Sequence, residues 1–204
     1  MAAVRRSWGR ARAELSLALA LRMLPPRVAW FCWRARRSAR RSNDRFSLDS
    51  AARPRELAEV LALAKGRRRV VELGTGTAWS AIALALDEHE RAVISYDPSV
   101  REQRDAYLAL AGRDARARIE LRAEPDSAGP HDADQAAQML FVDSTHDRPS
   151  VLAAFAAWQH ALAPGADVAF HDYGHPEYPG VAEAIDELGL DGRESGGLFV
   201  WRAP

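Results

Sequence analysis

The sequence contains very little of the residue types that several classes of protein require. Among its 204 residues there is one cysteine, Cys32, which excludes an intrachain disulfide and a zinc site built from a cysteine cluster. The only lysine is Lys65, which excludes a reductase site of the Tyr-x-x-x-Lys kind. A chain that needs no disulfide fits a reducing compartment, and we therefore expect a cytoplasmic location.

Long apolar runs are also missing. The most apolar stretch, residues 13–33, is interrupted by Arg22, Arg27 and the pair Pro25-Pro26, whereas a membrane-spanning helix needs about 20 apolar residues. No clean cleavage site of a signal peptide follows the stretch. Two interpretations stay open: a pair of helices, broken at the prolines, that packs over the active site or simply on the main domain, and an amphipathic helix on a membrane.

The formal net charge is zero, but the charges are unevenly distributed. Residues 1–45 contain twelve arginines against only Glu14 and Asp44, a formal charge of +10, and the rest of the chain carries −10. An acidic body argues against a nucleic-acid partner. The basic arm suits a peripheral contact of residues 13–41 with the inner face of a membrane. A homodimer is left open as the oligomeric state.

From residue 54 onward, short apolar runs alternate with longer segments of helical periodicity. We expect strands at residues 69–73, 92–96, 117–122, 139–142 and 166–170, followed by a hairpin over 190–194 and 198–201. We expect helices at residues 54–65, 79–86, 100–111, 151–162 and 180–188. This alternation predicts an α/β fold, a doubly wound Rossmann-like and mostly parallel sheet with helices on both faces.

The predicted organisation has two parts. Residues 1–45 form a helical, basic arm and residues 46–204 form the α/β domain, with a linker at residues 42–53. Ligands of such domains bind at the carboxyl ends of the strands, so the residues that follow each strand are the candidates for the site.

The turn after the first expected strand has the composition of a nucleotide-binding turn. Gly74 and Gly76 allow the backbone to pass close to a ligand, and the helix that follows directs free N–H groups to the same place. Asp97 lies 21 residues beyond Gly76 at the end of the second strand, where a carboxylate can bind ribose hydroxyls. An ordinary tight turn is the alternative.

Glu72 and a missing glycine distinguish between two classes of cofactor. Thr77-Ala78-Trp79 follows Gly76, so the third glycine of a dinucleotide fingerprint is absent. The carboxylate of Glu72 would repel a pyrophosphate, but it suits a ligand with a cationic part such as the amino-acid portion of S-adenosylmethionine. A nicotinamide-dependent oxidoreductase and a non-catalytic, membrane-associated protein that binds S-adenosylmethionine are the alternatives.

The segment from Val70 to Ser80 resembles motif I of class I methyltransferases. Residues 141–146 and 170–181 are similar to methyltransferase family 24, the relatives of macrocin O-methyltransferase and of cephalosporin-hydroxylase-like enzymes. The resemblance covers roughly residues 54–202. It implies an S-adenosylmethionine-dependent O-methyltransferase that acts on a hydroxyl of a small molecule, sugar or glycan, and a seven-stranded sheet whose last strand is antiparallel.

The resemblance also implies roles for individual residues. Those expected to bind the cofactor are Glu72, Gly74, Thr75 and Gly76 at the methionine part, Asp97 at the ribose, Glu124 near the adenine, and Asp143. In this sequence Thr145 stands where relatives often have a second aspartate after Asp143. In related metal-dependent enzymes that aspartate helps to take up a proton or to bind the metal, so its absence weakens the expectation of either role here.

Four titratable residues follow the fourth and fifth expected strands, namely Asp143, His146, His171 and Asp172. Methyl transfer is an in-line displacement in which a base takes the proton of the acceptor hydroxyl. In one version Asp143 and Asp172, with or without His171, bind Mg²⁺, which lowers the pKa of the hydroxyl. In the other, His146 or His171 is a metal-free general base. A structural role, in which His171 and Asp172 only cap the following loop, is the third.

Overall fold

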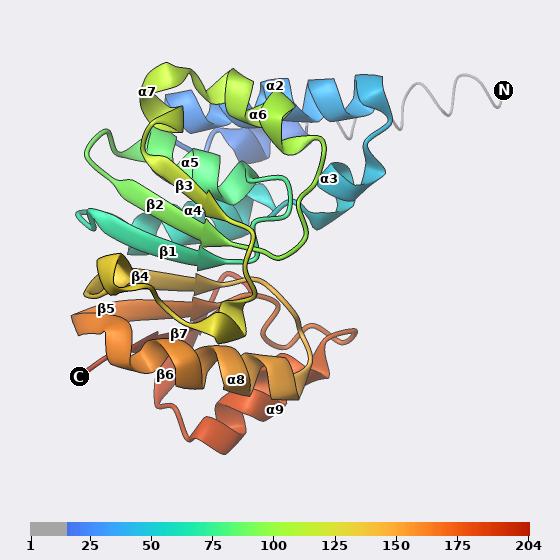
Figure 1. Ribbon diagram of the computed structural model, residues 1–204. Helices are drawn as coiled ribbons and strands as arrows, with labels where there is room; N and C mark the ends of the chain where they lie inside the picture. Colours follow the sequence, from blue (N-terminus) through green and yellow to red (C-terminus); the bar gives the residue numbers. More distant parts are fainter. Residues whose placement is uncertain (1–15) are drawn as a thin grey trace, which may run out of the picture.

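The computed structural model describes residues 16–204, and they form a seven-stranded sheet with helices on both faces (Figure 1). The strands are β1 (Arg69–Leu73), β2 (Ala92–Tyr96), β3 (Ile119–Arg122), β4 (Ala137–Val142), β5 (Leu162–Phe170), β6 (Gly192–Ser195) and β7 (Leu198–Arg202). Their order is β3-β2-β1-β4-β5-β7-β6, and β7 runs antiparallel to both of its neighbours. The predicted doubly wound sheet with an antiparallel last strand is confirmed.

The helices lie in two layers. They are α2 (Pro26–Ser42), α3 (Arg45–Ser50), α4 (Pro54–Leu63), α5 (Trp79–Asp87), α6 (Arg104–Ala111), α7 (Arg113–Arg116), α8 (Arg148–Trp158) and α9 (Pro179–Leu188), with short 3₁₀ turns η1 (Asp126–Ala128), η2 (Asp132–Asp134) and η3 (Gln159–Ala161). Buried side chains of α2, α4, α5, α6 and α7 share one core, and those of α8 and α9 share the other. None of the helices within residues 16–204 has the length and apolar character needed to cross a membrane.

The central strands supply both cores because successive side chains of a strand point to opposite faces. Val70 and Met139 pack in the core beneath α2, α4 and α5, whereas Val71 and Leu140 pack in the core beneath α8 and α9. All four side chains are completely buried. This burial on both faces explains why these parallel strands are continuous apolar runs rather than alternating ones.

The predicted linker at residues 42–53 is instead occupied largely by α3. Asp44 caps this helix, because its carboxylate accepts hydrogen bonds from the backbone N–H of Ser47 at 3.0 Å and from the Ser47 hydroxyl at 2.6 Å. The Tyr107 hydroxyl of α6 donates to the same carboxylate at 2.6 Å. A tertiary contact therefore holds a helix that the local sequence pattern does not indicate.

The N-terminal segment packs on the domain. Residues 16–21 are helical, the chain turns before Pro25-Pro26, and α2 then packs its buried face against α5. The predicted break at the prolines is confirmed, while residues 1–15 of the predicted arm lie outside the described part of the chain. The packing places α2 over α5 and α6 rather than over the carboxyl ends of β4 and β5 (Figure 1).

Most of the other boundaries differ from the prediction by one to four residues, most clearly between α8 and β5. Helix α8 ends at Trp158 rather than at residue 162, because η3 intervenes and β5 already begins at Leu162. The Trp158 indole N–H donates to the backbone carbonyl of Asp126 at 2.8 Å. This hydrogen bond ties the helix end to the polar loop before β4, a long-range contact that periodicity does not reveal.

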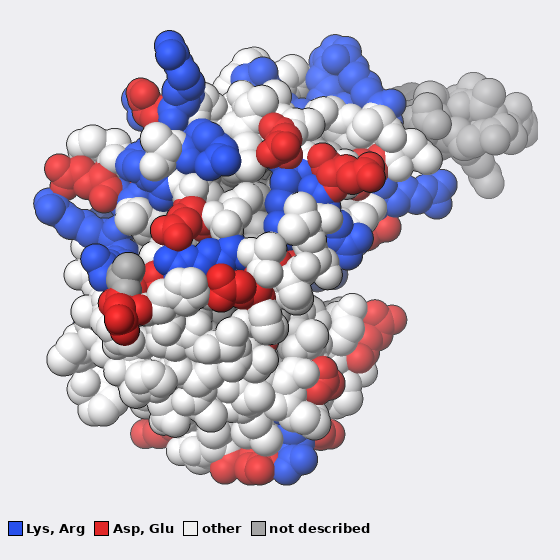
Figure 2. All heavy atoms as spheres, viewed as in Figure 1, with Lys and Arg blue, Asp and Glu red and all other residues white. Residues whose placement is uncertain are grey.

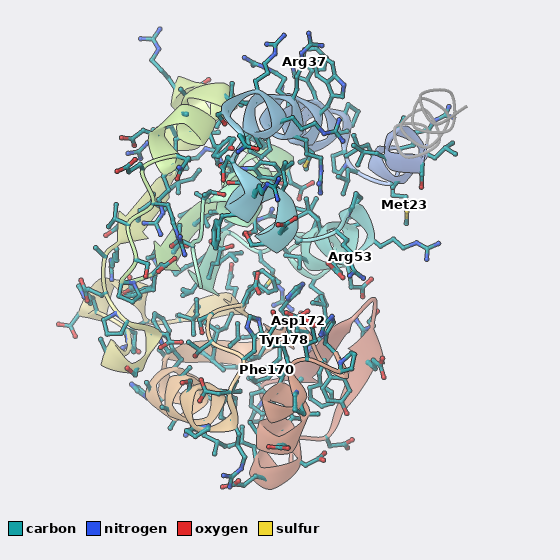
Figure 3. All side chains as sticks on the ribbon, turned by 90° about the vertical axis from the view of Figure 1, so that its right-hand side faces the viewer. Met23, Arg37, Arg53, Phe170, Asp172 and Tyr178 are labelled. Carbon is teal, nitrogen blue, oxygen red and sulfur yellow. The ribbon has the colours of Figure 1, made fainter. Side chains whose placement is uncertain are left out.

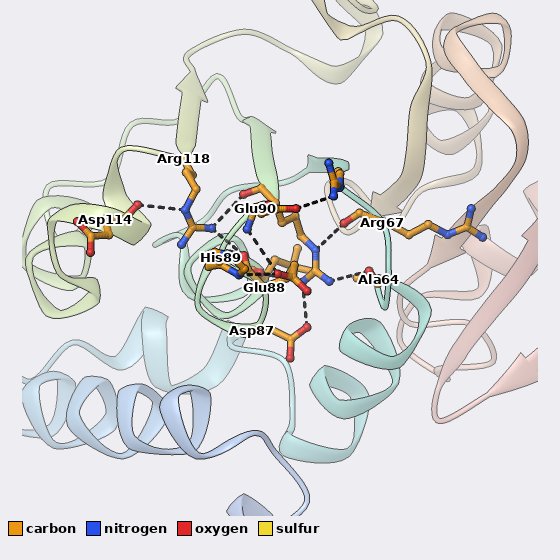
Figure 4. Close-up of polar contacts among 11 residues, drawn as sticks. Ala64, Arg67, Asp87, Glu88, His89, Glu90, Asp114 and Arg118 are labelled. Atoms are coloured by element: carbon orange, nitrogen blue, oxygen red, sulfur yellow. Dashed lines mark hydrogen bonds and ion pairs between the residues drawn. The ribbon is translucent and has the colours of Figure 1, made fainter.

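A buried arginine joins elements at the amino-terminal edge of the sheet, and its partners Ala64, Arg67 and Asp87 are labelled in Figure 4. Arg91 is 1% exposed, and its guanidinium donates to the carbonyls of Ala64, Arg67 and Leu84 at 2.6, 3.0 and 2.8 Å. It also donates to Asp87 at 3.0 Å. Since the burial of an unpaired charge is very costly, these contacts explain Arg91 as a structural residue on the edge opposite to the site.

Candidate functional site

The turn between β1 and α5 requires glycine at Gly74. Its φ is 104°, in a region that L side chains rarely adopt, and a Cβ there would lie 2.0 Å from the backbone oxygen of Asp143. The N–H of Gly74 donates to the carbonyl of Tyr96 at 2.8 Å, and the N–H of Asp143 donates to the carbonyl of Leu73 at 2.8 Å. The ends of β1, β2 and β4 are thus in direct contact at the turn.

Glu72 is a buried carboxylate beneath this turn. Its residue is 0% exposed, the Ser95 hydroxyl donates to one carboxylate oxygen at 2.5 Å, and Ser95 also contacts the Thr75 hydroxyl at 2.7 Å. The other carboxylate oxygen has no aligned hydrogen-bond partner among the described residues, although the Ser80 side chain is near enough to lower the pKa of the carboxyl. Burial raises the pKa of Glu72 to about 7, and the nearby negative charges of Asp143 and Asp97 act in the same direction. A cationic ligand group would relieve both effects.

Asp97 lies beside the turn, where its sequence position predicts it. Its carboxylate accepts hydrogen bonds from the N–H of Gly76 at 2.8 Å, from the guanidinium of Arg104 at 2.9 Å and from the N–H of Ser99 at 2.7 Å. Arg104, buried in α6, also donates to the carbonyl of Gly76 at 2.8 Å. Arg104 fixes both the carboxylate and the turn, and sequence reasoning missed it because nothing local distinguishes it from other helical arginines.

Glu124 lies at the rim of the site, after β3. Its side chain is 40% exposed, and a carboxylate oxygen is 2.9 Å from Nε2 of His131. Beneath this loop, Tyr96 and Arg122 contact the completely buried carboxylate of Asp134. This second buried cluster holds the loop that carries Glu124, and it was not predicted.

The predicted residues after β4 and β5 come together in one cluster. Ligand atoms of Asp143, His146, His171 and Asp172 all lie within 4.8 Å of one another. Nδ1 of His171 is 3.0 Å from Asp143 and 3.2 Å from Asp172, and Nε2 of His146 is 3.0 Å from Asp172 and 3.7 Å from Asp143. Figure 3 shows Asp172 close to Tyr178 near the middle of this face. We refer to these four residues as the Asp–His cluster.

The orientation of the two imidazoles is informative. Nε2 of His146 and Nδ1 of His171 form no aligned hydrogen bond, although carboxylate oxygens lie 3.0 Å from each. At His171 the attraction comes mainly from the negative charge of Asp143. Asp172 also has a φ of 56°, an unusual conformation for a residue other than glycine, and such backbone is found preferentially at functional sites.

The charges in the Asp–His cluster shift the pKa of each member. Burial alone would lower the imidazole pKa values, but Asp143 and Asp172 outweigh it and raise the pKa of His146 to about 9 and that of His171 to about 12. Burial opposes ionisation of the two aspartates, yet the imidazoles hold both carboxyl pKa values below the ordinary range. With no ion bound, both imidazoles are protonated at neutral pH.

Two further residues border the Asp–His cluster. A carboxylate oxygen of Glu56, at the start of α4, lies 3.5 Å from Nε2 of His171 and also accepts a hydrogen bond from the N–H of Arg53 at 2.7 Å. Sequence reasoning missed Glu56, because its position indicates only a helix-capping residue. Tyr178, in the predicted loop before α9, stacks on His146 with ring centroids 4.4 Å apart.

Thr145 is the position at which the sequence differs from the pattern of its relatives. Thr145 lies on the surface, while its neighbours Asp143 and His146 point into the Asp–His cluster. The cluster therefore has four donor residues without a contribution from position 145. The predicted weakening of base or metal chemistry by this residue stays untested.

Comparisons with known proteins bear on this arrangement. A family model described as a methyltransferase domain matches residues 71–173, half of the chain. None of the curated proteins compared with the chain matches it. The structure is similar to TomG, the O-methyltransferase of tomaymycin synthesis from Streptomyces achromogenes in complex with SAM, with 19% identity, a TM-score of 0.58, and coverage of 76% of this chain and 83% of TomG.

Two other solved structures have the same fold. CalS11, a TDP-rhamnose 3'-O-methyltransferase of calicheamicin biosynthesis, has 15% identity and a TM-score of 0.55, over 71% of this chain and 76% of CalS11. An O-methyltransferase from Bacillus cereus in complex with SAH has 14% identity and a TM-score of 0.56, over 76% and 84%. Because the matched family segment runs from the glycine turn to the end of the Asp–His cluster and spans half of the chain, this protein belongs to the methyltransferase domain family.

Proposed function

We propose that this methyltransferase moves the methyl group of S-adenosylmethionine to a hydroxyl oxygen of a small-molecule or sugar acceptor. One observation carries the proposal. The backbone of Asp143 touches Gly74 of the glycine turn, while its carboxylate lies 3.0 Å from His171. A site for a nucleotide-like cofactor and a cluster able to hold or move a proton are therefore adjacent.

The residues of the turn fit S-adenosylmethionine. The unpartnered oxygen of Glu72 would accept the cationic amino group, Gly74 and Gly76 would admit the methionine part to the backbone, and Asp97 would bind the ribose. When bound, this cofactor supplies a methyl group on a positively charged sulfur. TomG and the Bacillus cereus enzyme, which share the fold, were solved with SAM and SAH, and this supports the assignment.

The Asp–His cluster would orient the acceptor and, once one of its imidazoles has released its own proton, take the proton of the acceptor hydroxyl. His146 is the more exposed imidazole, with 24% of its side chain accessible against 10% for His171, and Tyr178 stacks on it. A hydroxyl beside His146 would therefore lie against an aromatic wall. CalS11, a sugar O-methyltransferase of the same fold, supports a sugar among the acceptor classes.

The donors of the Asp–His cluster do not fit Mg²⁺. Mg²⁺ prefers an octahedron of oxygen ligands, whereas two of the four donors here are imidazole nitrogens. Mg²⁺ therefore has no role in the proposed transfer of the methyl group. Two imidazoles with two carboxylates suit borderline ions such as Zn²⁺, Mn²⁺ or Fe²⁺. The ring nitrogens lie about 3 Å from the carboxylate oxygens without an aligned hydrogen bond, as expected where the lone pairs of both kinds of atom point at one bound ion.

The metal assignment is tested by calorimetric titration of chelator-treated protein with Zn²⁺, Mn²⁺ and Mg²⁺. We expect Zn²⁺ or Mn²⁺ to bind with one ion per chain, to bind more tightly than Mg²⁺, and to lose affinity in His146→Ala. Full activity in a chelator would contradict a metal-dependent reaction and leave an imidazole that has first lost its own proton as the base.

The cofactor assignment is tested by titrating the protein with S-adenosylmethionine, SAH and NAD. We expect the first two to bind with one molecule per chain and NAD to show no binding. Binding of NAD alone would contradict the proposal. The oxidoreductase alternative is already disfavoured by the family match and by the buried carboxylate of Glu72. Cofactor binding without turnover on any acceptor would instead support the non-catalytic alternative.

A further inference from the structure

The outer surface of the N-terminal helices combines exposed apolar side chains with arginines. Residues 16–43 contain seven arginines and no acidic residue. Of the large hydrophobic side chains that are exposed in the described part of the chain, Leu19, Met23, Trp30 and Trp33 all belong to this segment, at 56, 55, 60 and 41% exposure. Four of the seven exposed large hydrophobic side chains of the described residues therefore gather on one basic surface, which lies outside the segment that matches the methyltransferase family.

The surface has a defined geometry. Trp30 and Trp33 stack with ring centroids 4.9 Å apart, and the Arg37 guanidinium lies 5.4 Å above the Trp33 ring. These residues are at helical spacing on α2, opposite to the face that packs on α5, where Phe31 and Ala35 are buried. Between α2 and residues 17–24, the side chains of Trp30, Trp33 and Arg37 line an open groove of about 1040 Å³.

We infer that this surface, residues 17–41, docks on a bilayer that contains anionic phospholipid. Tryptophan and long aliphatic side chains partition into the interface between headgroups and acyl chains, and arginines at the same level bind the phosphates. Figure 2 shows Lys and Arg side chains over α2 at the upper edge of the molecule. The exposed apolar side chains match the boundary of the acyl chains at a membrane surface, and the arginines match the layer of phosphate groups above it.

Other occupants fit this surface less well. A symmetric contact with a second copy would bring seven arginines against seven arginines with no acidic residue between them, which is repulsive. A nucleic acid would pair with the arginines, but it would leave aliphatic side chains such as Leu19 and Met23 against a polar backbone.

Docking by this surface would leave the catalytic face uncovered. In Figure 3, Arg37 lies at the upper edge of the molecule, whereas Asp172 and Tyr178 lie near the middle of the face toward the viewer. The two surfaces adjoin each other without overlapping. An acceptor could therefore reach the Asp–His cluster while α2 rests on the membrane.

The test is flotation of the full chain with vesicles of phosphatidylcholine alone and with added phosphatidylglycerol. We expect binding to the anionic vesicles at least about tenfold stronger than to neutral ones, weakened by salt. Arg37→Glu/Arg41→Glu should abolish the binding. Arg55→Glu/Arg113→Glu, which changes the net charge equally at exposed sites elsewhere, should retain it.

A second variant separates apolar insertion from charge. Trp30→Ala/Trp33→Ala keeps all arginines, and we expect several-fold weaker vesicle binding and loss of tryptophan quenching by brominated lipid in this variant. Equal flotation with both vesicle types, or equal losses in both arginine variants, would overturn the inference. So would binding of an oligonucleotide without binding of vesicles, or a dimer in solution that Trp30→Ala/Trp33→Ala converts to monomers.

Discussion

Asp143 links the two halves of the site through different atoms. Its backbone oxygen occupies the space that a side chain at Gly74 would need, and its carboxylate attracts both imidazoles of the Asp–His cluster. Any shift of the glycine turn would therefore move the groups that would face the acceptor. Two other carboxylates border the site, Glu72 near Asp143 beneath the glycine turn and Glu56 beside His171, and each can be tested singly.

Glu72→Gln should weaken binding of S-adenosylmethionine by about tenfold or more, because it removes the charge that would pair with the cationic amino group. The side chain keeps its size, and the burial of a carboxylate that raises its pKa to about 7 is relieved, so the fold should be retained or stabilised. Calorimetric titration measures the affinity for S-adenosylmethionine, and thermal melting measures the stability of the variant. Unchanged affinity in a folded variant would show that Glu72 does not contact the cofactor.

Glu56→Gln should lower the pKa of His171, since a carboxylate 3.5 Å from Nε2 stabilises the protonated ring. NMR titration of the imidazole measures this in metal-free protein. Glu59→Gln is the matched control, because Glu59 lies on the same helix but contacts Arg193 and Ser195. We expect a reduced kcat with unchanged cofactor affinity in Glu56→Gln only. Identical imidazole titration in both variants would exclude Glu56 as a positioning residue.

Among the elements, the β1–α5 turn and α3 control access to the cofactor side. Phe46 of α3 lies over Gly76, where a Cβ would come within 3.7 Å of its ring, and the Arg101 guanidinium lies 3.8 Å from the centroid of that ring. The Ser47 and Thr77 hydroxyls are hydrogen-bonded at 2.9 Å, and Ser47 is the acceptor because its own proton is donated to Asp44. Helix α3 is thus attached to the turn by both packing and a hydrogen bond.

Gly74→Ala should disrupt the turn, because the new Cβ would lie 2.0 Å from the backbone oxygen of Asp143 and the residue would keep an unfavourable φ of 104°. We expect loss of cofactor binding and a clearly lower Tm. Gly66→Ala is the control, since its φ is also positive, at 73°, but no atom lies within 4 Å of the new Cβ. It should cost only about 1 kcal/mol. Equal effects of the two substitutions would contradict the close approach.

The sequence predicted elements best where burial alone decides them. The bounds of β1 and β2 were predicted to the residue, because strands buried on both faces are continuous apolar runs between polar ends. Helix α3 was missed, since Asp44 holds it through Tyr107 of a distant helix. Glu56 and Arg104 were missed for the same reason, as each acts across the fold. The family match confirms the predicted methyltransferase, whereas the catalytic roles within the Asp–His cluster stay predictions.

For the whole molecule, the Asp–His cluster makes stability depend on pH. The folded pKa of His146 is about 9 and its ordinary value is 6.5, so the folded state binds this proton more tightly than the unfolded state. The stabilisation is complete below pH 6.5 and is lost as the pH rises through about 9. The raised pKa of His171, about 12, extends the same trend to higher pH.

We therefore expect the free energy of unfolding of chelator-treated protein to fall between pH about 7 and about 9. Urea denaturation at several pH values measures it. His146→Gln should flatten this dependence, whereas His160→Gln, on the 3₁₀ turn η3 outside the site, should not. A wild-type stability that stays constant over this range would mean that the carboxylates do not hold the His146 proton.

The most direct test of the proposed function is transfer of label from methyl-labelled S-adenosylmethionine to a panel of hydroxylated acceptors that includes nucleotide-linked sugars. We predict label on an acceptor oxygen and formation of SAH in equal amount by the wild type. At a cofactor concentration below the wild-type Kd, we predict transfer that is about tenfold or more slower with Glu72→Gln and no transfer with Asp143→Asn. Transfer that is unaffected by both substitutions, or label found only on nitrogen or carbon, would contradict the account.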